Sequence, residues 1–386
     1  MRRLLLASLM LYSACDFPHG SLGARDGAPP GDAADAPMID AMIDGPAPLC
    51  YGRAPFTVCL SAEPSGAVVL AGSIESTACT YNGVTALPGE IVTAENGSMV
   101  CVVAGASIDM TGISVGTSGD KPVVLIASGN ITVPSGTRLD ASSATNNVTG
   151  VPTGPGFDPP DCGAPAPGGA NDNGAGGGAG GSFGSVGGNG AAGVAAAGGT
   201  AKPAAMNVVT LRGGCPGGDG GAGTNGGVLG GPGGGAIALF AHGMLMIDGT
   251  VTASGAAGVG GKVSRGGGGG GGSGGMIVMH AQTIMIGGSA VIVANGGGGG
   301  GGAGNSSSGG ENGTDAGSLL TTPAAGGNDT GGGASVGGNG ATKGAPAQDA
   351  PSAANGGGGG GGGLGIIRVL SGLQQLNTAR FSPNPS

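Results

Sequence analysis

The chain has 386 residues, of which 98 are glycine and 25 are proline, and it contains no tryptophan. This composition excludes a conventional core of bulky side chains, and the arrangement of the glycines in blocks, not at every third residue, excludes collagen. The net charge is −9, and the 13 Lys and Arg residues form no basic cluster, which excludes a nucleic-acid-binding protein.

Residues 1–14 have the pattern of a lipoprotein signal peptide. Arg2 and Arg3 precede an apolar run, which is followed by small residues and then Cys15. Residues 12–15 (YSAC) resemble a bacterial lipobox, although Tyr12 stands where an aliphatic residue is usual. We therefore expect lipidation at Cys15 and attachment to a membrane through this lipid. The alternative is ordinary signal cleavage without lipid.

Residues 15–49 are rich in Asp, Pro and Ala, and they lack the apolar residues needed for a core. This composition predicts a disordered, solvated tether. We interpret the Met-Ile-Asp triplets at 38–40 and 42–44 as solubilising charge and not as a metal motif. The folded domain is then expected to span residues 50–386.

Six cysteines remain when Cys15 is set aside, and an even number in an exported chain predicts disulfides formed in an oxidising compartment. None of them forms a C-x-x-C motif, so neither a zinc site nor a redox motif is indicated. Fifteen pairings are open in principle. Our preference for near neighbours gives Cys50–Cys59, Cys79–Cys101 and Cys162–Cys215.

Short apolar segments recur along the domain, and each combines a strand, a polar break, a second strand, a glycine turn and a third strand. The segments are 99–116, 122–142, 235–255, 275–296 and 365–382, and residues 66–74 resemble the start of a further copy. We expect positive φ angles at the turn glycines Gly136, Gly249 and Gly288. Three short strands in about 20–25 residues are typical of one coil of a parallel β-helix. The sequence thus predicts an all-β fold, a right-handed parallel β-helix.

Three long insertions separate the later repeats, at residues 143–234, 256–274 and 297–364. They contain the glycine blocks and otherwise mainly Ala, Ser, Asn and Pro. The interpretation that we favour from the sequence is flexible surface loops. The alternative is that the glycine runs pack side by side as extended or polyproline-II-like rows, which would require residues without side chains.

Two further segments, residues 48–60 (PLCYGRAPFTVCL) and 211–221 (LRGGCPGGDGG), complete a pattern with the lipobox-like start, the tether and the repeats. In these features the chain resembles glycine-rich, repeat-containing lipoproteins of the myxobacterial type. The resemblance implies a location in the cell envelope, at the outer membrane or the cell surface. It implies no activity that could be assigned to residues.

A catalytic site on a β-helix would need carboxylates gathered from neighbouring coils. Asp109, Asp140 and Asp248 are the candidates, but alignment of the repeats places them at three different positions, with Met246 and Met285 at the position of Asp109. We expect these carboxylates to be isolated and solvent-facing, and we predict no enzyme activity and no cofactor.

Histidine gives no stronger signal. His19 lies in the tether, while His242 and His280 each close the first strand of a repeat and could approach each other. Such a pair can bind a metal ion, but a polar position at a turn is the interpretation that we favour, so no metal site is predicted.

These observations favour a lipid-anchored envelope protein with a structural or adhesive role, which binds polysaccharide weakly at many places through Thr, Ser and Asn. The alternative is a carbohydrate-active β-helix enzyme, a lyase or hydrolase, with a site built from the insertions. Three or more carboxylates in one cleft would favour the enzyme. An ice-binding protein would need a flat ladder of threonines, which the sequence lacks.

Overall fold

The computed structural model describes residues 49–81, 89–145, 153–305, 307–371, 373–376 and 380–386. They belong to one unit, Pro48–Ser386. Their regular structure consists of β-strands and one short 3-10 helix, η1 (Pro160–Cys162), which confirms the predicted all-β class. Among these residues, no helix has the length and apolar character needed to cross a bilayer.

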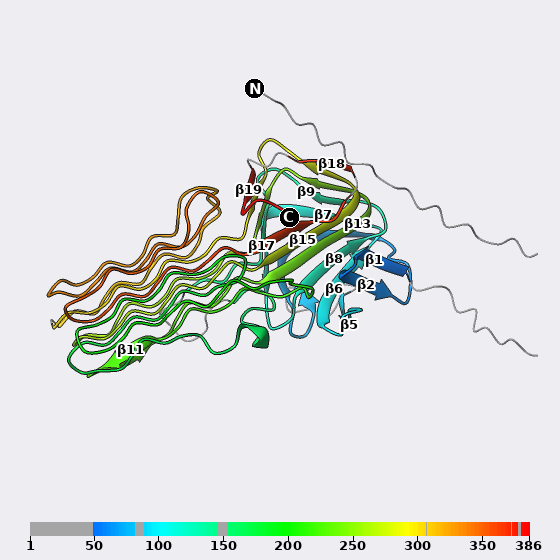
Figure 1. The fold of residues 1–386 in the computed structure, drawn as a ribbon. Coiled ribbons are helices and arrows are strands. Elements are labelled where there is room, and N and C mark those ends of the chain that lie inside the picture. Colours follow the sequence, from blue (N-terminus) through cyan, green and yellow to red (C-terminus); the bar gives the residue numbers. More distant parts are fainter. Residues whose placement is uncertain (1–48, 82–88, 146–152, 306, 372, 377–379) are drawn as a thin grey trace, which may run out of the picture. The chain divides into compact units, whose positions relative to one another are not determined.

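Three ladders of parallel strands make up most of the β-sheet of this fold (Figure 1). The first ladder contains β6 (Met99–Gly105), β8 (Val123–Ala127), the first halves of β13 (Ala236–Ile247) and β15 (Met276–Ile286), and β17 (Ile366–Val369). The second contains β3 (Ala67–Glu75), β7 (Ser107–Ser118), β9 (Ile131–Val133), the second halves of β13 and β15, and β18 (Leu373–Gln375). The third contains the ends of β3 and β7, β10 (Arg138–Asp140), β14 (Thr250–Thr252), β16 (Val291–Val293) and β19 (Phe381–Ser382).

The remaining strands are antiparallel. β1 (Leu49–Arg53) and β2 (Phe56–Leu60) form a hairpin. β4 (Thr80–Tyr81) pairs with β3, and β5 (Gly89–Thr93) pairs with β6. β11 (Gly220–Gly223) and β12 (Gly226–Val228) pair within the first insertion.

Each predicted repeat from residue 99 onward contributes one strand to each ladder. The strands pair in parallel and in register, so that Val123, Ile237 and Ile277 lie over one another. Residues 66–74 differ from the prediction, because β3 pairs with β7 in the second and third ladders and contributes nothing to the first. This segment therefore corresponds to the later part of a repeat and not to its start.

The expectation for the turn glycines was correct only for Gly136, which has a φ of 81°. Gly249 and Gly288 do not have positive φ angles. At Gly249 the constraint is close backbone approach, because a Cβ atom would lie 2.4 Å from the carbonyl oxygens of Pro134 and Thr137. At Gly288 a Cβ atom would meet nothing within 4 Å, so neither reason requires glycine there.

The first ladder is buried on both faces. Leu125 and Leu239 belong to the inner core, to which strands of all three ladders contribute side chains. Their neighbours Ile126 and Phe240 belong to a second, outer core, which Tyr51 of the β1–β2 hairpin and Phe183 of the first insertion complete. Because both faces exclude water, these strands are continuously apolar and do not alternate.

The three insertions leave the fold at equivalent places. Each one follows a strand of the third ladder (β10, β14 or β16) and returns to a strand of the first (β13, β15 or β17). Since these strands are stacked, the insertions start and end side by side, and Figure 1 shows their chains running together away from the ladders.

The glycine runs in these insertions are ordered and buried, so the favoured expectation of flexible surface loops was wrong. Residues 174–183, 266–272, 296–304 and 356–363 are buried throughout. We call these runs the glycine rows, together with the segments hydrogen-bonded beside them, which are residues 164–170, 186–192, 197–201, 216–221, 229–234, 256–261, 310–316, 324–328, 335–341 and 348–350. Their backbone groups bond to other rows, as burial of amides away from water requires.

The row at residues 174–181 is bonded to a different row on every side. The amides of residues 176–178 donate to Gly169, Ala191 and Gly268, and their carbonyls accept from Gly221, Gly199 and Gly360, at 2.8–2.9 Å. Three residues later, the amides of residues 179–181 bond to the same three rows. This period of three is that of the polyproline II conformation.

At the glycine positions of this row even a methyl group would not fit. A Cβ atom on Gly177 would lie 1.9 Å from the carbonyl oxygen of Gly358, and one on Gly180 would lie 1.9 Å from that of Gly361. Glycine is therefore required by close backbone approach. The second interpretation of the insertions, that of packed rows, agrees with the structure.

Candidate functional site

Several of the predicted functional residues lie outside the described part of the chain. These are Cys15 with its signal peptide, His19, and the tether up to residue 48. The six other cysteines form disulfides in the pairs that the sequence favoured: Cys50–Cys59, Cys79–Cys101 and Cys162–Cys215.

The three candidate carboxylates of the repeats are not brought together. The position of Asp109 in the second ladder is taken by Thr132, Met246 and Met285 in the following strands. Asp140 lies in the third ladder, where it forms an ion pair of 2.9 Å with Arg138. The ladders thus present no column of carboxylates built from these residues.

His242 and His280 come near each other, but their partners are aromatic. His242 stacks on Tyr51 with 4.2 Å between ring centroids, and His280 meets the edge of Phe240 at 6.4 Å. Burial, with Arg53 and His242 nearby, lowers the pKa of His280. Among the described residues, the only close group of three possible metal ligands contains Cys50 and Cys59, which a disulfide occupies.

One surface that the sequence did not predict lies where the glycine rows reverse direction, at the end away from the ladders. We call the segments there the distal turns: residues 170–174, 192–196, 222–226, 261–266, 304–305, 329–334 and 353–356. Hydrogen bonds join them. Asn171 N donates to Ala222 O, Arg265 N to Gly304 O, and Val194 N to Asn355 O, at 2.9–3.2 Å. All three insertions therefore contribute to one surface.

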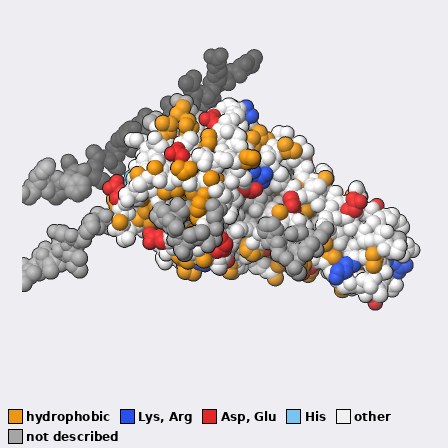
Figure 2. All heavy atoms as spheres, turned by 180° about the vertical axis from the view of Figure 1, so that it is seen from behind, with side chains coloured by type: hydrophobic (Ala, Val, Ile, Leu, Met, Phe, Trp, Pro, Cys, Tyr) orange, Lys and Arg blue, Asp and Glu red, His pale blue; other side chains and the backbone are white. Residues whose placement is uncertain are grey.

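The distal turns carry the polar side chains that the rows exclude. Asp172, Thr224, Lys262 and Asn305 are exposed there, and Figure 2 shows basic and acidic side chains at this end of the rows. Arg265 Nη1 lies 3.4 Å from Asn173 Oδ1, and Arg265 has a φ of 69° although it is not glycine. Such a conformation is uncommon for a side chain of this size and is found at functional sites more often than elsewhere.

A second feature is a hollow of about 430 Å³ at the base of the first insertion. Asp120, Asp158 and Asp161 line it, together with Arg212 and Phe157. A further hollow of about 320 Å³ is lined by Asp158 as well, together with Asp219. No sequence pattern indicates this cluster, because Asp120, Asp158 and Arg212 come from segments that are far apart in the chain.

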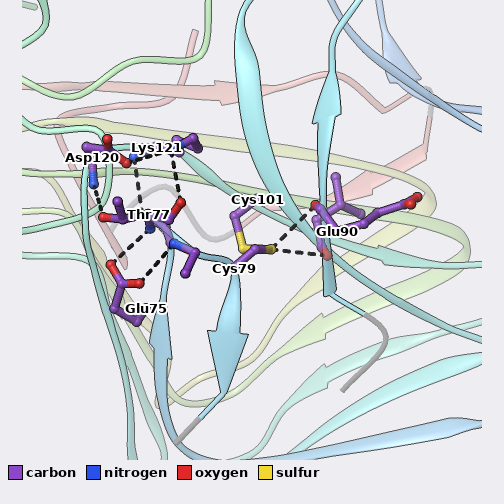
Figure 3. The surroundings of a disulfide bond; sticks show 10 residues. Glu75, Thr77, Cys79, Glu90, Cys101, Asp120 and Lys121 are labelled. Atoms are coloured by element: carbon purple, nitrogen blue, oxygen red, sulfur yellow. Dashed lines mark hydrogen bonds and ion pairs between the residues drawn. A yellow bond between two sulfur atoms is a disulfide. The ribbon is translucent and has the colours of Figure 1, made fainter. Parts of the chain in front are cut away.

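Two of these carboxyl groups have different environments. Burial raises the pKa of Asp158 to about 6, although the amide of Gly233 donates to its Oδ1 at 2.8 Å. Lys121, whose Nζ lies 2.9 Å from Asp120 Oδ1, holds the pKa of Asp120 below its usual value. Figure 3 shows Asp120 and Lys121 beside Thr77, whose Oγ1 accepts from the Asp120 amide.

In comparisons with protein-family models, with curated proteins and with solved structures, nothing matches this chain.

Proposed function

We propose that this protein is a lipid-anchored protein of the bacterial cell envelope, with Cys15 as the lipidated residue, and that the distal turns form an adhesive surface for polysaccharide. In this proposal the three ladders are the faces of a parallel β-helix, which is right-handed because nearly all parallel crossover connections are. The three disulfides support export to an oxidising compartment.

The adhesive role is supported by the difference in side chains between the glycine rows and the distal turns. The interior rows, such as 174–181 and 266–272, consist of glycine and alanine and so carry no polar side chain for binding. The turns of all three insertions meet at one end, where Asn, Thr, Asp, Lys and Arg side chains are displayed on a support joined by backbone hydrogen bonds. Amides and hydroxyls at fixed positions suit the hydroxyl groups of sugars, and several weak contacts on one support give avidity.

Adhesion can be tested with a glycan array and the chain from residue 50 to 386. A triple variant, Asp172→Ala with Thr224→Ala and Asn305→Ala, removes exposed side chains of the distal turns. We expect its glycan binding to fall at least tenfold. The matched control, Thr200→Ala with Gln348→Ala, changes exposed side chains along the rows and should bind as the unchanged protein does. Equal loss in both variants, or no binding by the unchanged chain, would remove the adhesive proposal.

The anchor is tested separately by mass analysis of the mature N-terminus from cells grown with and without globomycin. Acyl chains on Cys15, and accumulation of the precursor under globomycin, are expected. An unmodified N-terminus with normal processing would contradict the lipid anchor.

A second candidate function is a carbohydrate-active enzyme, and the hollow beside Asp158 favours it. Three carboxylates share one cleft, and the environments of Asp158 and Asp120 shift their pKa values in opposite directions, which is the arrangement of an acid and a base. If so, Asp158→Asn abolishes the release of reducing ends from a polysaccharide panel, whereas Asp219→Asn, in the neighbouring hollow, leaves most of it. Absence of any cleavage by the unchanged chain excludes this candidate.

A further inference from the structure

Arg212 is a buried cation whose only carboxylate partner among the described residues is distant and exposed. It is 8% exposed, and its guanidinium lies over the ring of Phe183 at 4.8 Å. Its ion-pair partner is Asp161, whose Oδ2 lies 3.7 Å from Arg212 Nη1 and whose side chain is 72% exposed. A distance of 3.7 Å to a solvated carboxylate compensates a buried charge poorly.

The closest partners of this guanidinium are the two sulfur atoms of a disulfide. Arg212 Nη2 lies 3.0 Å from Cys162 Sγ and 3.1 Å from Cys215 Sγ. A disulfide carries no charge, whereas a thiolate at either position would supply an anion closer to Arg212 than the carboxylate of Asp161. A nearby cation stabilises a thiolate and therefore the reduced form of the pair.

The other two disulfides have the opposite surroundings. Glu95 Oε1 lies 3.8 Å from Cys59 Sγ, so a thiolate in that pair would face a carboxylate. Cys79 Sγ lies 3.4 Å from the carbonyl oxygen of Glu90 and 3.7 Å from that of Val102, as Figure 3 shows for the first of these. Negative or partly negative oxygen atoms disfavour a thiolate at both of these disulfides.

We propose that Cys162–Cys215 is a thiol–disulfide exchange site, which a dithiol reductant opens in preference to the two other disulfides. Cys162 is partly exposed and Cys215 is buried, and both line a small opening beside Lys202. The thiolate of the reductant bonds to Cys162 Sγ, the Cys162–Cys215 bond breaks, and its electron pair leaves with Cys215 Sγ as a thiolate next to Arg212.

The exchange is then completed by the second thiol of the reductant. This thiol attacks the reductant's own sulfur in the mixed disulfide, and the bond to Cys162 Sγ breaks. The reductant leaves as its disulfide, and Cys162 Sγ takes up a proton. Two electrons pass from the dithiol to the protein in all. Opening this bond frees the start of the row at residues 164–170 from Cys215, but the amides of Gly168 and Gly169 still bond to neighbouring rows. The rows therefore stay folded after reduction.

The test uses the exported chain in a series of dithiothreitol redox buffers. Free thiols are trapped by an alkylating mass tag, and each disulfide is quantified from its own peptides. We expect Cys162–Cys215 to be reduced with an equilibrium constant at least about tenfold above those of the other two, which corresponds to about 30 mV. Arg212→Gln should remove this difference, whereas Arg212→Lys should keep most of it.

The control variant is Lys202→Gln, because Lys202 Nζ donates to the carbonyl oxygen of Cys162 and not to a sulfur atom. It should leave the order of reduction unchanged. If Arg212→Gln does not fold, the pH dependence of Cys215 alkylation in the partly reduced natural chain decides, with a thiol pKa below the usual value of about 8.5 expected. Joint reduction of all three disulfides, or an unshifted Cys215, overturns the proposal.

Discussion

The amide of Gly178 donates to the carbonyl oxygen of Gly268 at 2.9 Å and so joins the first insertion to the second. The contact is repeated three residues later between Gly181 and Gly271. It is possible only because neither row has side chains at this interface. The stability of the glycine rows should therefore depend on glycine itself at specific positions.

Gly178→Ala is expected to destabilise the domain strongly. The new Cβ atom would lie 1.9 Å from the carbonyl oxygen of Gly218. The row cannot shift to remove this clash, because the backbone of other rows lies on every side of it. We expect a loss of about 3 kcal/mol or more in the free energy of unfolding, measured with urea. Gly317→Ala is the matched control, because a Cβ atom there meets nothing within 4 Å, and its effect should stay within about 0.5 kcal/mol. Equal effects would contradict this account of the rows.

The ladders could be predicted from the sequence because their information is local. Each strand is a short apolar run that recurs at equivalent places in the repeats. Residues 235–255 and 275–296 were predicted as two such repeats, and in the structure they bring Ile237 and Ile277 into register. The rows could not be placed in this way. Their neighbours come from distant parts of the chain, and a run of glycines specifies no partner.

A signal for the rows was nevertheless present. In rows at the surface every third residue faces water, and this is where larger residues occur, as with Val186, Asn189 and Ala192. Among the rows surrounded on all sides, 266–272 is glycine throughout, and 174–181 is glycine except for Ala175 and Ala179. A spacing of three between non-glycine residues therefore marks a surface row, and an unbroken glycine block marks an interior one.

The candidate sites likewise divide into those that local sequence patterns predict and those that they do not. Near-neighbour pairing was enough to find the disulfides. The hollow at Asp158 and the contact of Arg212 with Cys162 and Cys215 depend on how the first insertion folds back on the ladders, and no local pattern encodes that.

Phe183 should link the glycine rows to the ladders. It is fully buried and belongs to the outer core against the first ladder, although it lies in the first insertion. We expect Phe183→Ala to cost about 3–5 kcal/mol, the usual range for a buried aromatic side chain. Hydrogen exchange should show the loss of protection in both the row at 174–181 and strand β13. Val186→Ala, at a side chain that is 50% exposed, should leave both unchanged.

Asp158 should make the domain more stable in mildly acidic solution. Its pKa is about 6 in the folded chain and near the ordinary 3.8 in the unfolded chain, so between these values only the folded chain keeps the proton. The contribution of Asp158 to the free energy of unfolding therefore falls by up to about 3 kcal/mol as the pH rises from about 4 to above 6. Asp158→Asn removes the titration. The variant should be more stable than the unchanged chain at pH 7.5 and equal to it at pH 4, as measured by urea unfolding. A variant less stable at pH 7.5 would refute this.

His280 should give the β1–β2 hairpin a pH dependence opposite to that from Asp158, so that the hairpin becomes less stable as the pH falls. Burial first, and then Arg53 of β1 and His242 of β13, lower its pKa below 6.5, so the unfolded or undocked state takes up a proton first as the pH falls. Stability from the neutral ring is present above pH 6.5 and is lost below it. Hydrogen exchange of the amides of β1 and β2 should therefore accelerate between pH 7 and pH 5, after correction for the intrinsic rate, while amides of β16 in the third ladder keep their protection. His280→Gln carries no charge in this range and should make the hairpin insensitive to pH. If the hairpin of this variant still loosens as the pH falls, another group is responsible.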